Sequence, residues 1–333
     1  MRLVPLSDQR KFLSLKMDMK RNTNSIVKKK FYYNWLGRPS SLKRSQVLFI
    51  LTVFIPLIAL FLIIRIIPIV TVFGISLTNL HLIRPVTKFI GIRNFTHLLG
   101  DEQFISSFFN SVEYVVVAVP LEIVLGLTFA LMLNRKVKFE SLYETLYFIP
   151  YILPMVPVAI IWKWFYTPGS FGLANYLLGS LGLPYVPWMS NPEIALLITI
   201  GIHVWKNLGY FVIIFLVGLK NVPNNLREAS KIDGATNWQT IRLIELPLIK
   251  PIILYGVVMA TVWSWSAFTE VYIMTQGTDI STGAEIQVLV YRLYQEAFVF
   301  HNMGRGCAVS FVVFLISLGI VLVEFKTLRW RGR

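Results

Sequence analysis

The sequence predicts an all-α, polytopic membrane protein with about six transmembrane helices. Of the 333 residues, 55% are hydrophobic and only 15% are charged, whereas about a quarter are charged in ordinary soluble domains. The apolar residues are gathered in blocks of roughly twenty or more, the length that crosses a bilayer as a helix. One polar segment between these blocks, residues 226–247, carries the capping and turn signals of a helix–turn–helix.

The chain begins with a basic segment, residues 1–45, which holds twelve Lys and Arg and two acidic residues. This composition predicts a solvated tail, with binding to anionic lipid as the alternative. The segment has no early apolar core, so we do not expect a cleavable signal peptide. The next domain, 46–107, contains the first transmembrane helix at about 46–75 and then an outer segment.

Five further spans are expected within the transmembrane core, 108–325, at about 111–133, 146–165, 194–216, 251–274 and 306–324. The span at 146–165 should be kinked, because Pro150, Pro154 and Pro157 lie within it and neighbouring helices can satisfy the freed carbonyls. Residues 167–192 have the composition of a loop with one short helix. A basic tail, 326–333, ends the chain.

The distribution of positive charge predicts the orientation of these spans. The segments that lie inside when the amino terminus is inside hold 24 of the 32 Lys and Arg, and the outer segments hold five. The positive-inside rule therefore favours six spans with both termini and residues 226–247 in the cytoplasm. The net charge of +15 is confined largely to loops and tails, so it indicates a membrane protein and not a nucleic-acid-binding one.

Residues 226–247 and the residues just before them contain several local signals. Pro223-Asn224-Asn225 ends the preceding segment and offers an asparagine cap for a short helix that begins near Leu226. Asp233-Gly234 predicts a turn in which the glycine takes a positive φ. Thr236 followed by Gln239 predicts a capping box at the start of a second short helix. Pro247 marks the entry to the next apolar block.

The same residues resemble a known motif. Glu228-Ala229-Ser230, then Gly234, then Ile244-Glu245-Leu246-Pro247 are similar to the EAA motif of permease subunits of binding-protein-dependent ABC importers, with Ser230 in place of an alanine. The sequence around Asp233-Gly234-Ala235 is most similar to that of the carbohydrate-uptake branch of the family, the maltose and glycerol-phosphate type. The resemblance implies an ATPase-coupling loop formed by Glu228, Ala229, Ser230, Asp233, Gly234, Ile244, Leu246 and Pro247.

The resemblance also implies partners and a location. These are a second homologous permease subunit or a copy of this chain, two nucleotide-binding ATPase subunits, an extracytoplasmic solute-binding protein, and a sugar or related polyol, in a prokaryotic plasma (inner) membrane. The sequence has no G-x-x-x-x-G-K-[ST] phosphate loop. We therefore expect no cofactor on this chain, with ATP and Mg on the ATPase subunits. No catalytic site is expected either, since there is no His-Glu-x-x-His motif and no recognisable nucleophile elbow. No metal site is expected, since the single cysteine and the four histidines lack metal-ligand spacing.

Polar and aromatic residues within two spans are candidates for the substrate pathway. His203, Lys206, Asn207 and Tyr210 share one helical face, and residues 263–270 form a similar stripe in the next span. Polar groups at bilayer depth usually face a bundle interior or a watery cavity, where they bind substrate or join helices. The candidate pathway residues are His203, Asn207, Tyr210, Trp263, Ser264, Ala267 and Glu270.

Two alternatives remain open at this point. An ion-coupled secondary transporter would use Glu122 or Glu270 as its proton or cation site, but it leaves the EAA-type loop without a role. An ABC permease for a non-sugar solute, such as an amino acid, a peptide or a polyamine, would keep that loop. The sequence therefore predicts an importer permease, most similar to those for sugars.

Overall fold

The computed structural model describes residues 41–84, 86–135, 138–169, 171–276 and 286–330. Most of the predicted basic tail, 1–45, and the last residues of the chain lie outside this part. The chain divides into two units, Met1–Pro68 and Ile69–Arg333. In the first unit, α2 (Ser41–Phe61) continues into a π-helical turn, η1 (Leu62–Ile66).

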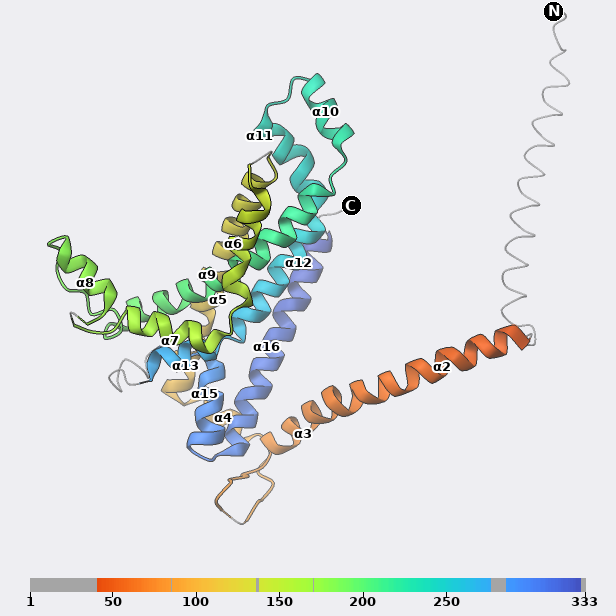
Figure 1. The fold of residues 1–333 in the computed structure, drawn as a ribbon. Helices are drawn as coiled ribbons and strands as arrows, with labels where there is room; N and C mark the ends of the chain where they lie inside the picture. The colour runs from red at the N-terminus through yellow and green to blue at the C-terminus, as the bar shows by residue number, and fades with distance from the viewer. Residues whose placement is uncertain (1–40, 85, 136–137, 170, 277–285, 331–333) are drawn as a thin grey trace, which may run out of the picture. The chain divides into compact units, whose positions relative to one another are not determined.

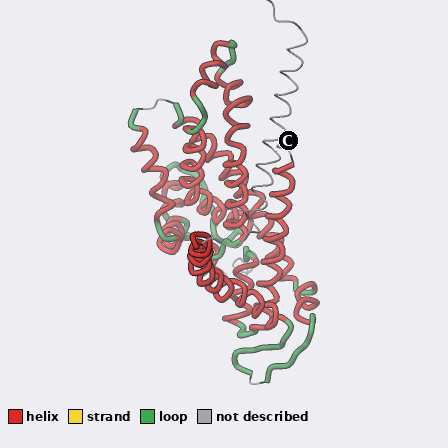
Figure 2. The backbone as a smooth tube through the Cα atoms, turned by 90° about the vertical axis from the view of Figure 1, so that its right-hand side faces the viewer, coloured by secondary structure: helices red, strands yellow, loops and turns green. Residues whose placement is uncertain are grey.

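Helices form most of the described backbone, and loops, drawn green in Figure 2, connect them. After η1 the elements in chain order are α3 (Ile67–Ser76), α4 (Arg93–Leu99), α5 (Glu102–Leu133), α6 (Glu140–Ile152), α7 (Met155–Phe165), α8 (Leu173–Ser180), α9 (Pro192–Lys220), α10 (Asn224–Ile232), α11 (Asn237–Thr240), η2 (Ile241–Glu245), α12 (Leu246–Trp265), α13 (Thr269–Thr275), α15 (Leu289–Tyr294), η3 (Gln295–Val299) and α16 (Met303–Trp330).

Five of the described helices are long and apolar enough to cross a membrane, or six if one bent pair counts as a single span. The five are Ser45–Ser76, Glu102–Leu133, Pro192–Lys220, Asn237–Thr275 and Met303–Lys326. The predicted all-α, polytopic fold with about six spans is thereby confirmed. The helices extend beyond the predicted apolar blocks, since helical hydrogen bonding continues into the polar residues at their ends.

The bent pair is α6 and α7, which meet at an angle of 92°. Leu153 between them is extended, with φ −65° and ψ 137°, and Pro154 follows as the residue before α7. A residue that precedes proline is sterically pushed out of the helical region. The kink predicted from the prolines is therefore present, and it is sharp enough to break the span into two helices.

Helix α9 is the centre of the bundle, because α5, α6, α12 and α13 all pack against it. Its apolar side chains Phe211 and Phe215 are fully buried between α5 and α12. Its contact with α6 is closer still: a Cβ atom at Gly209 would lie 2.0 Å from the carbonyl oxygen of Tyr147. Only glycine allows the two backbones to approach this closely.

An ion network joins α5 to α15 and η3 at the end of the bundle that carries α4. The guanidinium of Arg292 lies 2.8 Å from Asp101 Oδ2 and 2.8 Å from Glu296 Oε1, and it donates to Gln103 Oε1 at 2.6 Å. Asp101 also caps α5 by accepting from the backbone N–H groups of Gln103 and Phe104. Although partial burial acts to raise it, the pKa of Asp101 is held below its usual value by Arg292 and these N–H groups.

We expect Asp101→Asn to lower the thermal unfolding midpoint at pH 7, because asparagine keeps the helix cap but loses the ion pair. The loss should amount to roughly 1–3 kcal/mol. A depressed carboxyl pKa stabilises the fold above the ordinary Asp value of about 3.9, and that stability is lost as the pH falls through the depressed value. The difference between variant and wild type should therefore shrink in acid, whereas Glu102→Gln, an exposed control in the same turn, should change little at either pH.

Candidate functional site

A cavity of about 280 Å³ lies among α7, α9, α12 and α13. It is lined by Met155, His203, Lys206, Asn207, Trp263, Ser266, Ala267, Phe268, Thr269 and Glu270. Five of the seven predicted pathway residues are in this lining, so the structure brings the two predicted stripes together. Aromatic rings, an amide, hydroxyls and charged groups all face the same space, which suits a polar solute with apolar faces.

The two remaining predicted residues lie beside the cavity. Ser264 is buried behind its wall, with Oγ 3.4 Å from His203 Nε2. Tyr210 exchanges a hydrogen bond of 2.8 Å with Tyr255, and its ring packs on Trp263 with the centroids 4.8 Å apart. Both residues support lining groups, and neither is part of the lining.

The lining differs from the prediction at the break between α12 and α13. The stripe at 263–270 was expected on one continuous helix, but α12 ends at Trp265 and α13 begins at Thr269. Lys163 of α7 holds α13 in place by donating from Nζ to the carbonyl oxygens of Ile273, at 2.8 Å, and Gln276. The break turns Glu270 toward α9 and places Ser266, Ala267 and Phe268 at the cavity as loop residues.

Some lining residues were not among the candidates. Lys206 shares the predicted helical face, and its Nζ donates to the carbonyl oxygen of Tyr151 at 3.3 Å. Met155 comes from α7 and Phe268 from the break, so the spacing within α9 and α12 carries no signal for them. Lining residues that lie outside α9 and α12 can be identified only from the tertiary fold.

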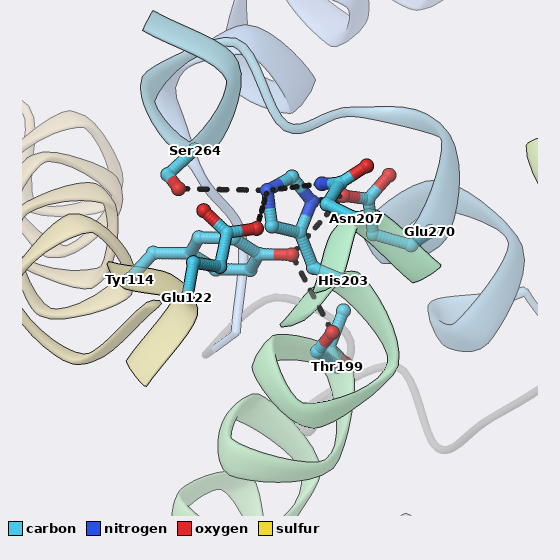
Figure 3. A network of polar contacts seen from close by, with 7 residues as sticks. All are labelled: Tyr114, Glu122, Thr199, His203, Asn207, Ser264 and Glu270. Carbon is cyan, nitrogen blue, oxygen red and sulfur yellow. Dashed lines mark hydrogen bonds and ion pairs between the residues drawn. The ribbon is translucent and has the colours of Figure 1, made fainter. Parts of the chain in front are cut away.

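A buried polar cluster lies behind the cavity, centred on His203 (Figure 3). His203 Nδ1 is 2.7 Å from Glu270 Oε1, and the hydroxyl of Tyr114 donates to the same oxygen at 3.1 Å. On the other side, His203 Nε2 is 3.1 Å from Asn207 Nδ2 and 3.6 Å from Glu122 Oε1. Glu122 is fully buried and Glu270 nearly so. Charged groups this deep in a bundle stay there only when they are paired or share protons.

The predicted coupling loop, 226–247, forms a helical hairpin at the end of the bundle opposite α4 and α15 (Figure 1). Gly234 has φ +77°, and Thr236 and Gln239 form the capping box, so both of these local predictions are confirmed. The predicted cap was wrong. Helix α10 begins at Asn224, with Pro223 as the preceding residue and no side-chain cap, because proline favours the extended conformation that leads into a helix.

Internal bonds hold the hairpin together. Arg227 Nε lies 2.8 Å from Glu245 Oε1, which ties α10 to η2. Ser230 is buried, and its hydroxyl is 3.0 Å from that of Thr240. Ser230 therefore joins α10 to α11 from within. Of the other predicted coupling residues, Ile244 and Leu246 are half-buried, and Glu228, Ala229, Asp233, Gly234 and Pro247 are exposed.

Large apolar side chains protrude from this hairpin. Ile232, the last residue of α10, is 86% exposed, Trp238 in α11 is 64% exposed and Leu243 in η2 is 68% exposed. The hairpin thus combines a capped, internally bonded backbone with exposed apolar side chains.

A bundle of membrane-length helices, with a polar and aromatic cavity and a capped helical hairpin at one end, is typical of membrane permeases. Residues 122–327 match the family of binding-protein-dependent transport system inner membrane components. This match covers more than half of the chain, and the chain belongs to that family. The prediction of an importer permease from the EAA-type residues is confirmed, and the secondary-carrier alternative is set aside.

Two named relatives align with most of the chain. The trehalose/maltose transport system permease protein MalF of Thermococcus litoralis is 31% identical over 277 residues, which are 83% of this chain and 92% of the relative. The arabinooligosaccharides transport system permease protein AraP of Bacillus subtilis is 30% identical over 272 residues, with 81% and 85% covered.

A solved structure has the same fold. It is a chain from the crystal structure of a bacterial alginate ABC transporter in complex with an alginate pentasaccharide-bound periplasmic protein. The TM-score is 0.77 at 24% identity, and the similarity covers 88% of this chain and 97% of that chain. It therefore supports the helical architecture described above.

Proposed function

We propose that this chain is a membrane-spanning permease subunit of an ABC importer that takes up a saccharide or a related polyol. The observation that carries this proposal is the cavity, where Trp263 and Phe268 lie beside Asn207 and the hydroxyls of Ser266 and Thr269. Aromatic rings pack against the apolar faces of sugars, and amides and hydroxyls bond to sugar hydroxyls. The names of the relatives, which include permeases for trehalose/maltose and for arabinooligosaccharides, support the same substrate class.

The energy comes from elsewhere in the assembly. Two nucleotide-binding subunits hold ATP and Mg and hydrolyse the nucleotide, and the hairpin 226–247 docks into them. Ile232 and Trp238, together with Leu243, supply apolar contact area for that docking, because their side chains are exposed. An extracytoplasmic binding protein delivers the saccharide, and a second permease subunit completes the pathway.

The orientation follows from the hairpin. Docking to an ATPase requires residues 226–247 in the cytoplasm, and the concentration of Lys and Arg in the same set of segments supports this orientation. Both termini are then cytoplasmic, in the inner membrane of a prokaryote. Closure of the ATPase pair moves the hairpin, and the spans alternate between inward-open and outward-open arrangements around the cavity.

Uptake measurements test the substrate class. Cells that lack this chain should lose uptake of at least one of four radiolabelled probes, namely trehalose, maltose, an arabinose oligosaccharide and an alginate oligosaccharide. Re-expression of the chain should restore that uptake, and uptake of labelled histidine should stay unchanged throughout. If all four saccharides enter normally and uptake of histidine, a peptide or a polyamine falls instead, the permease carries a non-sugar solute.

A further inference from the structure

The buried cluster contains two carboxyl groups and one imidazole ring that could pair with them. Glu122 comes from α5 and Glu270 from α13, and the single ring of His203 lies between them. The proposed transport function uses the cavity surface, but it assigns no task to Glu122, whose relative exposure is 0%. The question is therefore what keeps this carboxyl group inside the bundle.

The side of the ring that faces Glu270 has a single arrangement of protons. Glu270 Oε1 accepts from the Tyr114 hydroxyl at 3.1 Å and from His203 Nδ1 at 2.7 Å. Because the carboxylate accepts both bonds, Nδ1 carries a proton. His203 is therefore either the neutral Nδ1–H tautomer or the doubly protonated imidazolium, and the remaining choice concerns Nε2 alone.

The side of the ring that faces Glu122 allows two arrangements. Without a proton, Nε2 accepts from the Asn207 amide at 3.1 Å or from the Ser264 hydroxyl at 3.4 Å. With a proton, Nε2 donates to Glu122 Oε1, which lies 3.6 Å away. Asn207 lines the cavity, so the choice at Nε2 decides whether its N–H groups are tied to the ring or available to a solute.

The position of the Asn207 nitrogen near Nε2 matches the arrangement without a proton on Nε2. In that arrangement neither carboxylate oxygen of Glu122 has a hydrogen-bond partner of good geometry within the described part of the chain, and the nearby Asn207 amide is directed to the ring. An ionised carboxylate without a donor is costly to bury, whereas the neutral acid is not. One proton is therefore held between Glu122 and His203 Nε2: when Nε2 lacks it, Glu122 carries it.

We propose that Glu122 and His203 share one proton, and that its transfer between them switches Asn207 between the ring and the cavity. When the proton is on Glu122, Asn207 donates to His203. When it moves to Nε2, the imidazolium pairs with Glu122, and the amide of Asn207 turns its N–H groups toward the solute. Glu122 is thus a positioning residue that acts through His203, and its effect on transport rests on the function proposed above.

The other polar groups near the His203 ring are few, and they come from α5, α9, α12 and α13. Tyr114 joins Glu122 on α5, Lys206 lies one turn from His203 on α9, and Glu270 is on α13. Helix α12 contributes the uncharged hydroxyl of Ser264. Tyr114 and Glu270 are bonded to each other, and Lys206 bonds to a carbonyl oxygen, so the exchangeable proton belongs to Glu122 and Nε2.

Infrared spectroscopy of the full-length chain, assembled with its transporter in lipid nanodiscs, tests the proton directly. A protonated carboxylic acid has a carbonyl stretching band that a carboxylate lacks. We expect this band in the wild type at neutral pH, its loss in Glu122→Gln, and its retention in Glu113→Gln, a matched control on the exposed side of α5. If the spectra of Glu122→Gln and the wild type coincide, Glu122 holds no proton and the proposal is wrong.

His203→Gln provides a second variant that does not remove the carboxyl group. Without an imidazole to take the proton, the Glu122 band should persist to higher pH than in the wild type. An unchanged pH dependence of the band would mean that the two groups share no proton, which contradicts the proposal.

Transport is measured separately, as the uptake of radiolabelled trehalose. In Glu122→Gln, which cannot pass a proton to Nε2, Asn207 should stay bonded to the ring, and the KM should rise about threefold to tenfold, the factor that one hydrogen bond is worth. A lost band with an unchanged KM would contradict the switch of Asn207. Absence of trehalose uptake in the wild type would count against trehalose as substrate while leaving the infrared result valid.

Discussion

Replacing Gly209 with alanine should remove most of the protein from the membrane fraction. The new Cβ would lie 2.0 Å from the carbonyl oxygen of Tyr147 and 2.7 Å from its carbon. Both atoms belong to the backbone of α6, so no side-chain rotation relieves the clash, and α6 and α9 must move apart. Overpacking of this kind costs typically 1–3 kcal/mol and more when backbone must shift, which is a large part of the stability of a fold.

The matched control is Gly201→Ala on the same helix. A Cβ at Gly201 meets nothing within 4 Å, and alanine is the better helix former. Membrane abundance and the thermal unfolding midpoint should fall for Gly209→Ala and stay normal for Gly201→Ala. Equal abundance of the two variants would show that α6 and α9 are not packed as closely as described.

Replacing Gly234 with valine should abolish uptake while the chain remains in the membrane. Gly234 has φ +77° at the turn between α10 and α11, and the space around its Cα is open, so the conformation alone demands glycine. An L-residue pays roughly 1–2 kcal/mol in this region, and a β-branched residue is the least tolerant. The turn should rearrange and withdraw Ile232 and Trp238 from the proposed docking surface.

The control for this prediction is Gly234→Asn, because asparagine enters the left-handed region most readily among residues with a Cβ. The asparagine variant should retain most of its uptake. Co-purification of the ATPase subunit with a tagged chain should fall at least severalfold for valine only. If the valine variant retains the ATPase and transports normally, the hairpin does not depend on this turn for docking.

Local signals in the sequence were sufficient for the hairpin. The capping box of Thr236 and Gln239 involves residues three apart, and the turn at Gly234 requires only one residue type, so both could be predicted without any tertiary information. The start of α10 was misplaced by two residues, since Pro223 and Asn225 both fit the beginning of a helix. Apolar block length predicted the number of spans for the same local reason.

The site could be predicted only in part. The spacing of His203 and Asn207 correctly placed them on one face, because a helix fixes that relation. The break after Trp265 has neither proline nor glycine within 266–268, so nothing in the local sequence predicts it. The meeting of Glu122, His203 and Glu270 depends on how three helices pack, which is information that no single segment contains.

The unbroken backbone from α11 through η2 into α12 has a mechanical consequence. At a rise of about 1.5 Å per residue, the path from Thr240 to Trp263 is a single rod about 35 Å long, slightly more than the thickness of the hydrocarbon core. One end of this rod carries the hairpin, and the other ends in the cavity wall. If the hairpin docks as proposed, a displacement at its end would be passed to Trp263 along continuous helical backbone and would need no relay of side chains.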